Sequence, residues 1–238
     1  MSRASLPELQ QQRLGGTAPP PVMTFPWRLP VIHWFVDRLG LCECRRRLLH
    51  MLPGLLPIFL CVLPHQDPWG VPLLGAMIGL SLTVIAIAFL RESDFARPDE
   101  TLWHHSVIGY AVPVLSMLIL LPGKSELGLM TLGILAFGDG SAALGGKLIG
   151  GYRLPWNRRK TWAGLFSFVV AGTIVASFNY WIDARPAVPI GIALSIGGAA
   201  ALAGAMVESL PIRSHDNLRV GATAAMTGLL MHIMLLGW

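Results

Sequence analysis

The chain has 238 residues, of which 53% are hydrophobic and only 13% are charged, and its mean hydropathy is +0.59. Soluble globular domains carry about 25% charged residues, so this composition excludes an ordinary soluble domain, a coiled coil and a free nucleic-acid-binding protein. The net charge of +5 is explained by the basic loops of a membrane protein rather than by nucleic acid. The three cysteines form no set of metal-ligand pairs and no disulfide framework.

Residues 1–44 differ in composition from the rest of the chain. Their prolines, glycines and consecutive glutamines predict a disordered or interfacial N-terminal tail, and they contain no apolar stretch typical of a signal peptide. Residues 45–238 are predicted to form one transmembrane domain, an all-α polytopic bundle of about seven helices. Pro53 and Pro57 predict that the first apolar segment is either kinked or re-entrant. The seven segments cover residues 48–63, 69–90, 103–121, 125–148, 161–182, 187–210 and 219–237.

Lysine and arginine residues are unevenly distributed among the loops. Sixteen of the 18 lie before the first segment or in the loops that follow segments two, four and six, whereas Lys124 and Arg185 lie in other loops. Loops rich in Lys and Arg are retained in the cytoplasm. The distribution therefore predicts a multi-pass protein with a cytoplasmic N-terminus and an external C-terminus. The loops that follow segments two, four and six would lie on the cytoplasmic side.

Two acidic residues interrupt the apolar segments, Asp139 in the fourth and Glu208 near the end of the sixth. An ionisable group at membrane depth costs about 2.5–3.5 kcal/mol, so it usually faces the protein interior and has a function there. A buried ion pair that holds helices together is the alternative. Asp216 and Asn217 follow in the next cytoplasmic loop. Because Mg²⁺ prefers oxygen ligands and leaves positions for phosphates, these four residues are candidate magnesium ligands.

Small residues surround Asp139 and recur at every fourth position. On a helix they form one face, which predicts close packing of two membrane helices. Beside an acid, the same face would also allow a phosphate to approach the backbone. The series consists of Gly138, Ala142, Gly146 and Gly150.

A basic run follows this segment, at Arg158, Arg159 and Lys160. Thr161 is in position to cap the next helix, whose free N–H groups favour anions. Together with Lys147, the run predicts a polyphosphate pocket, although the membrane topology alone would also account for these cations.

These motifs resemble a family of membrane lipid kinases that comprises phytol kinase, dolichol kinase and the CTP-dependent diacylglycerol kinases. The family pattern G-D-x-x-A-x-x-x-G-x-x-x-G, followed by K-T-x-x-G, begins here at Gly138 and ends at Gly164. The sequence RRLLH, which ends at His50, is similar to the family motif R-K-x-x-H, with Arg47 in place of its lysine. The sequence ESLPI from Glu208 is most similar to the phytol kinase branch. The resemblance covers about residue 45 to the C-terminus.

The resemblance implies transfer of the terminal phosphate of CTP, or another nucleoside triphosphate, to an isoprenoid alcohol such as phytol, geranylgeraniol or farnesol. Asp139 and Lys160 would be catalytic, with Asp139 binding Mg²⁺ or accepting the hydroxyl proton. Glu208, Asp216 and Asn217 would be further metal ligands. Arg47 and His50 would contact the substrate or its phosphate. The implied nucleotide-binding residues are Gly146, Lys147, Gly150, Arg158, Arg159, Lys160 and Thr161.

Other functions remain open at this point. They are a CTP-dependent diacylglycerol or dolichol kinase, an enzyme similar to phosphatidate cytidylyltransferase, and a small transporter or membrane scaffold without catalysis. The cytidylyltransferase signature is missing near the C-terminus, and the two halves show no repeat of the kind found in transporters. The predicted partners are a membrane lipid substrate, a nucleoside triphosphate and the bilayer, without nucleic acid, and no oligomeric state is predicted.

Overall fold

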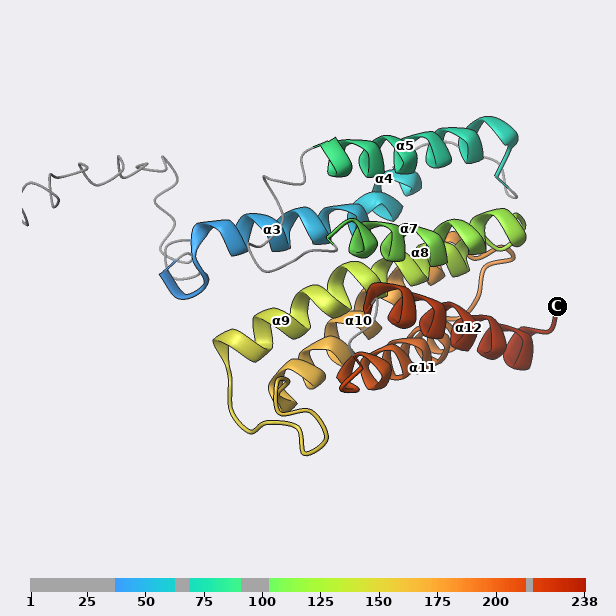
Figure 1. The fold of residues 1–238 in the computed structure, drawn as a ribbon. Helices are drawn as coiled ribbons and strands as arrows, with labels where there is room; N and C mark the ends of the chain where they lie inside the picture. Colours follow the sequence, from blue (N-terminus) through green and yellow to red (C-terminus); the bar gives the residue numbers. More distant parts are fainter. Residues whose placement is uncertain (1–36, 63–68, 91–102, 213–215) are drawn as a thin grey trace, which may run out of the picture. The chain divides into compact units, whose positions relative to one another are not determined.

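The computed structural model describes residues 37–62, 69–90, 103–212 and 216–238 (Figure 1). Within these ranges the chain is helical and contains no strand, apart from one isolated pairing of Arg153 with Thr161. The predicted all-α bundle is therefore confirmed, and each of the seven predicted segments contains a helix. Most of the predicted tail lies outside the described residues. The helices are α3 (Leu41–Met51), η1 (Leu52–Leu55), α4 (Leu56–Val62), α5 (Val71–Leu90), α7 (Trp103–Leu120), α8 (Ser125–Gly133), η2 (Ile134–Gly138), α9 (Asp139–Leu148), α10 (Trp162–Asp183), α11 (Ile190–Ser209) and α12 (Asp216–Leu236).

Among the described residues, four helices are long and apolar enough to cross a membrane. They are the continuous helix Ser125–Leu148, which joins α8, η2 and α9, and the helices α10, α11 and α12. Shorter apolar stretches, Val71–Ile87 and Val107–Leu120, lie in α5 and α7. About 20 residues are needed to cross the hydrocarbon core, and α5, with 20 residues from Val71 to Leu90, also reaches that length.

The first predicted segment is divided by its prolines. Helix α3 ends at Met51, the 3₁₀ turn η1 carries Pro53 and Gly54, and α4 follows. Proline cannot donate a backbone hydrogen bond and collides with the preceding turn, so the predicted kink is confirmed. Gly54 is buried, and a Cβ added there would lie 2.5 Å from the Cβ of Ala136. The break in the helix thus packs against η2, the turn that precedes Asp139.

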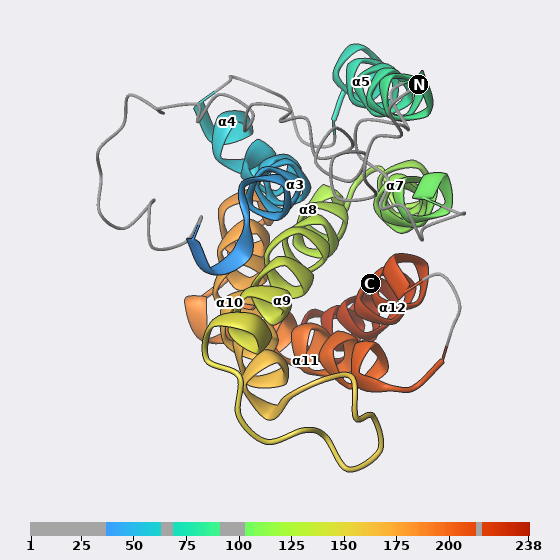
Figure 2. The same cartoon turned by 60° about the vertical axis from the view of Figure 1, so that its left-hand side comes forward.

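Small residues allow the remaining helices to pack closely. Helix α10 packs against α9 and α11, and α12 packs against α11 and α7 (Figure 2). A Cβ added at Gly197 of α11 would lie 2.5 Å from Ser177 Oγ, and one at Gly221 of α12 would lie 2.6 Å from Pro113 Cγ. Small residues at such contacts let two helix backbones approach closely.

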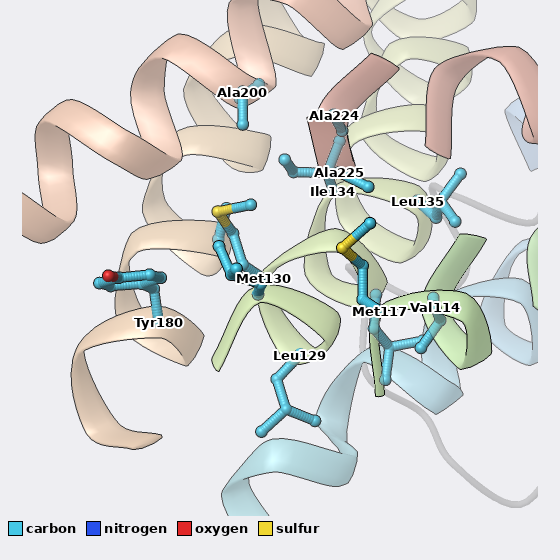
Figure 3. Close-up of a cluster of buried hydrophobic side chains, with 14 of the residues drawn as sticks. Val114, Met117, Leu129, Met130, Ile134, Leu135, Tyr180, Ala200, Ala224 and Ala225 are labelled. Carbon is cyan, nitrogen blue, oxygen red and sulfur yellow. The ribbon is translucent and has the colours of Figure 1, made fainter. Parts of the chain in front are cut away.

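The apolar core surrounds α8 and η2 (Figure 3). All nine residues of α8 are buried, including the polar Ser125, Glu126 and Thr131. Met130 and Ile134 are fully buried there, beside Ala200 of α11 and Ala225 of α12. Since α8 continues directly into η2 and α9, this core fixes the position of Asp139.

Candidate active site

Asp139 is the first residue of α9 and directly follows the π-helical turn η2. Single π turns occur inside α-helices, often at functional sites. The neighbouring glycines admit other helices, because a Cβ at Gly138 would lie 2.7 Å from Phe168 and one at Gly140 would lie 2.7 Å from Met51. The Asp139 side chain is 25% exposed, so its carboxylate is held by the bundle and still open on one side.

Helix α3 supplies two partners for this carboxylate. His50 Nε2 lies 3.1 Å from Asp139 Oδ2 and 3.1 Å from the carbonyl oxygen of Leu135. Both partners are acceptors, so we assign a proton to Nε2. Arg47 Nη1 lies 3.6 Å from the same Asp139 oxygen. The spacing of three residues places Arg47 and His50 on one face of α3, and that face is turned towards Asp139.

A second ion pair joins the start of α10 to the end of α11. The Lys160 ammonium donates to the carboxylate of Glu208. The Glu208 side chain is only 7% exposed, and a buried acid of this kind is strongly destabilising without a partner. Lys160 is also close enough to Asp139 for its charge to act on that carboxylate. The two ion pairs therefore belong to one electrostatic cluster.

Hydrogen bonds hold the loop before α10 against α11. Asn157 Nδ2 donates to the carbonyl oxygen of Ser209 at 3.0 Å, and Trp156 Nε1 donates to Ser209 Oγ at 3.0 Å. Thr161 Oγ1 accepts from the backbone N–H of Gly164 at 3.1 Å, which confirms the predicted helix cap. These contacts fix Lys160, which lies between Asn157 and Thr161 in the chain.

Other predicted phosphate-binding residues lie apart from Asp139 or have a packing role. The Lys147 ammonium lies 3.1 Å from Glu43 Oε1. Arg158 and Arg159 are exposed. Gly146 faces α10, where an added Cβ would lie 3.3 Å from Thr161 Oγ1.

Gly150 is not part of the small-residue face that its spacing predicted. Helix α9 ends at Leu148, and Gly150 and Gly151 follow with φ of +67° and +89°. Glycine adopts this left-handed conformation readily and commonly terminates helices in it. The small-residue face therefore includes Gly138, Ala142 and Gly146 but not Gly150.

The predicted magnesium ligands are not assembled into one site. Among the described residues, no three His, Cys, Asp or Glu side chains gather as a metal-ligand set. Each predicted carboxylate has a cationic partner instead, and that of Asp216, which is 55% exposed, is Arg219. Asn217 lies beside Asp216 at the start of α12. The donor set does not fit a metal centre built by the protein alone. A single carboxylate such as Asp139 is compatible with Mg²⁺ that is held mainly by substrate phosphates.

Two further residues beside Asp139 and His50, Glu43 and Tyr110, were not predicted from the sequence. Glu43 accepts hydrogen bonds from Arg47 Nε at 3.2 Å and from Lys147 Nζ at 3.1 Å. Its spacing of four residues from Arg47 is typical of a helical ion pair and could have indicated it. Tyr110 donates to the carbonyl oxygen of His50 at 3.3 Å, and its ring meets the His50 ring edge-on at 5.1 Å. No sequence signal connects these two residues.

The chain is similar to curated plant proteins. A probable phytol kinase of Zea mays is 26% identical over 170 residues, which are 68% of this chain and 55% of the relative. Farnesol kinase of Arabidopsis thaliana is 31% identical over 132 residues, 51% of this chain and 41% of the relative. Phytol kinase 1 of the same plant is 26% identical over 190 residues, 74% of this chain and 62% of the relative. All three are described as chloroplastic.

These relatives confirm the resemblance to the phytol and polyprenol kinase family. The chain spans about half the length of the curated relatives it matches, from 41% to 62% of those named here. No family model and no solved structure matches the chain.

Proposed function

We propose that the chain is an integral membrane kinase that transfers the terminal phosphate of a nucleoside triphosphate to the hydroxyl of an isoprenoid alcohol. The observation that carries the proposal is the polar cluster of Asp139, Arg47, His50, Lys160 and Glu208 in a bundle whose core is mostly apolar. Intramembrane ionisable groups are rare and usually functional. The similarity to phytol kinase and farnesol kinase indicates the reaction and the acceptor class.

In the proposed reaction the alcohol oxygen attacks the terminal phosphorus, and the bond from that phosphorus to the nucleoside diphosphate breaks. The proton of the alcohol passes to the Asp139 carboxylate. His50 donates to this carboxylate, so its role is to hold Asp139 in place. Phosphoryl transfer depends mainly on alignment and on neutralising the phosphate oxygens. Lys160 would neutralise the oxygens of the transferred phosphate. Arg158, Arg159 and Lys147 would add positive charge where the nucleotide enters.

We propose CTP as the donor, following the resemblance of the motifs to a family of lipid kinases that generally uses CTP. Mg²⁺ would enter with the nucleotide and neutralise charge on its phosphates; Asp139 would be its protein ligand in the alternative in which the alcohol proton passes to another acceptor. Mg²⁺ commonly binds through one or two carboxylates together with substrate phosphates. Glu208 and Asp216 interact electrostatically with each other and lie at the same end of the bundle as Lys160. Together with Asn217, Glu208 and Asp216 remain candidates for a second protein contact with Mg²⁺.

We further propose that this end of the bundle faces the cytoplasm. The loop that carries Arg158, Arg159 and Lys160 and the residues that precede α4 hold most of the basic residues of the chain, which the positive-inside rule assigns to the cytoplasm. The N-terminus would then be cytoplasmic and the C-terminus external. Soluble nucleotide would reach the cluster from the aqueous phase, and the alcohol would reach it from the bilayer.

Label transfer with the purified chain in nanodiscs tests the proposal. The chain is incubated with Mg²⁺ and CTP labelled on its terminal phosphate, and the acceptors are phytol, geranylgeraniol, farnesol, a dolichol and diacylglycerol. We expect label in a C15–C20 isoprenoid phosphate, and transfer lower by about 10²-fold or more with the variant Asp139→Asn. ATP, GTP and UTP, offered with the preferred alcohol, identify the donor.

Each other outcome has a defined meaning. Preference for diacylglycerol or dolichol would replace the acceptor that we propose and retain the kinase. Transfer of the cytidylyl group instead of phosphate would indicate an enzyme similar to cytidylyltransferase. No transfer to any acceptor, with folded protein and each nucleotide, would overturn the proposed function and favour a transporter or scaffold.

A further inference from the structure

Three cations converge on one carboxylate beside the candidate active site. Glu43 of α3 lies 3.2 Å from Arg47 Nε, 3.4 Å from Arg46 Nε and 3.1 Å from Lys147 Nζ. The Glu43 side chain is only 14% exposed. Arg46 and Arg47 follow Glu43 on the same helix, at the spacings of ordinary helical ion pairs. Lys147 belongs to α9, so its contact with Glu43 also ties the two helices together.

Arg47 connects this cluster to Asp139. Its Nε donates to Glu43, while its Nη1 lies 3.6 Å from Asp139 Oδ2. A planar guanidinium presents its donors in fixed directions, so it can span two carboxylates, whereas an ammonium group acts as a point charge. Glu43 therefore determines the direction in which the Arg47 guanidinium approaches Asp139.

The charges around Glu43 are those that bind phosphate in proteins. Arginine and lysine donate charge-assisted hydrogen bonds to phosphate and to carboxylate oxygens in similar geometry. Arg46 Nε is buried and has no hydrogen-bond partner of good geometry among the described residues. Three positive side chains thus surround Glu43, and one of them, Arg47, also pairs with Asp139, so three cations face two carboxylates.

We propose that Glu43 is a positioning residue of the phosphotransfer site that occupies the place of a donor phosphate until the nucleotide binds. In the free protein, the Glu43 carboxylate holds Arg47 and Lys147 together. When the donor binds, its phosphates compete with this carboxylate for the two cations and replace it. The proposal rests on the proposed function for its role in turnover. It acts through the two cations, and Glu43 itself does not touch the reacting atoms.

The variant Glu43→Gln separates this role from a structural one. The amide keeps the size of the side chain and removes the competing charge, so phosphate should bind more tightly. Arg47 is then no longer fixed beside Asp139, so turnover should fall. A purely structural residue would lower the amount of active protein and leave the KM for the nucleotide unchanged. The expected signature is therefore a lower KM for CTP together with a lower kcat.

Binding of inorganic triphosphate, measured by calorimetry on the purified chain in nanodiscs, tests the competition without catalysis. We expect Glu43→Gln to bind triphosphate about 3- to 10-fold more tightly than the wild type, in keeping with the loss of one partly exposed charge interaction. The difference should shrink as salt is raised. The control Asp37→Asn removes the same charge from an exposed residue outside this cluster and should change nothing.

The variant Glu43→Asp retains the charge and should return both binding and turnover towards wild-type values. Tighter triphosphate binding together with lower turnover in Glu43→Gln supports the proposal, and any other combination overturns it. Loss of folded protein in both variants would assign Glu43 a structural role and would also overturn it. If the wild type phosphorylates no alcohol, the proposed function fails, whereas the triphosphate measurement still decides whether Glu43 competes for the cations.

Discussion

The ion pair between Lys160 and Glu208 can be tested for separate contributions to stability and to catalysis. The substitution Lys160→Met removes the ammonium group and keeps an unbranched side chain of similar length. It leaves Glu208, with a side chain 7% exposed, without its partner and in the field of Asp139, which carries the same charge. Glu208 would then lack its cationic partner, whereas Asp139 would retain Arg47 and His50.

The expected loss of stability follows from this burial. Removing one partner of a fully buried ion pair costs about 3–5 kcal/mol, whereas exposed pairs contribute about 0–1 kcal/mol. The Lys160 side chain is 29% exposed while Glu208 is almost fully buried. We therefore expect Lys160→Met to destabilise the protein by about 2–3 kcal/mol, between these limits.

The double variant Lys160→Met/Glu208→Leu separates the two effects. Replacing both members of a buried ion pair by apolar residues is often neutral for stability, so the double variant should unfold near the wild-type temperature. The cation that neutralises the transferred phosphate is still missing, and we expect turnover to remain about 10²-fold below wild type or lower. The assays are thermal unfolding of the purified protein and label transfer from CTP. Arg158→Gln, which removes an exposed cation from the same loop, controls for stability.

Two results would contradict this reasoning. Recovery of turnover together with stability in the double variant would mean that Lys160 acts only as the partner of Glu208. Unchanged stability in Lys160→Met would mean that Glu208 is hydrated in the membrane-embedded protein, contrary to its burial among α10, α11 and the loop that Asn157 anchors.

Three further predictions concern the rest of the cluster and its orientation. Asp139→Asn should lower label transfer by about 10²-fold or more while thermal unfolding stays near wild type, and normal turnover would refute the role of the carboxylate. Arg47→Lys should lower kcat by about 10-fold, because an ammonium group cannot span two carboxylates. The control Arg45→Lys, on the exposed side of α3, should leave kcat unchanged. Equal effects of the two substitutions would remove the special role of Arg47. In a cysteine-free background, a membrane-impermeant thiol reagent applied to intact cells should label Ala187→Cys and spare Pro155→Cys. Both positions are exposed and lie in loops. The reverse pattern of labelling would invert the proposed topology.

Features set by local sequence were predicted well. The apolar segments are long runs, and hydropathy locates such runs without knowledge of the fold. The helix break at Pro53 and the cap at Thr161 depend on the chemistry of a few neighbouring residues. The same applies to the close approach of α9 and α10 at Gly146, which needs only the absence of a side chain.

Features set by the rotation and depth of the helices were not predicted. The sequence placed Asp139, Glu208 and Asp216 at one end of the bundle but could not say which cation faces each of them. Lys160 and Glu208 are separated by 48 positions, and nothing local links them. The π turn before Asp139 is formed by the apolar sequence ILAFG, which carries no recognisable signal. These carboxylates were therefore predicted to share a metal, whereas each lies beside a cation in the structure.

The need to fold without substrate explains this difference. A bundle in an apolar environment must reach its final structure before a nucleotide binds, and an unpaired buried charge costs several kcal/mol. The acids of the cluster are therefore neutralised by the basic residues nearest to them, at Arg47, Lys147 and Lys160. On the proposed function, the same cations are needed by the phosphates of the donor. Binding must then exchange one set of anionic partners for another, so the free energy gained from the phosphates is reduced by the ion pairs that they replace.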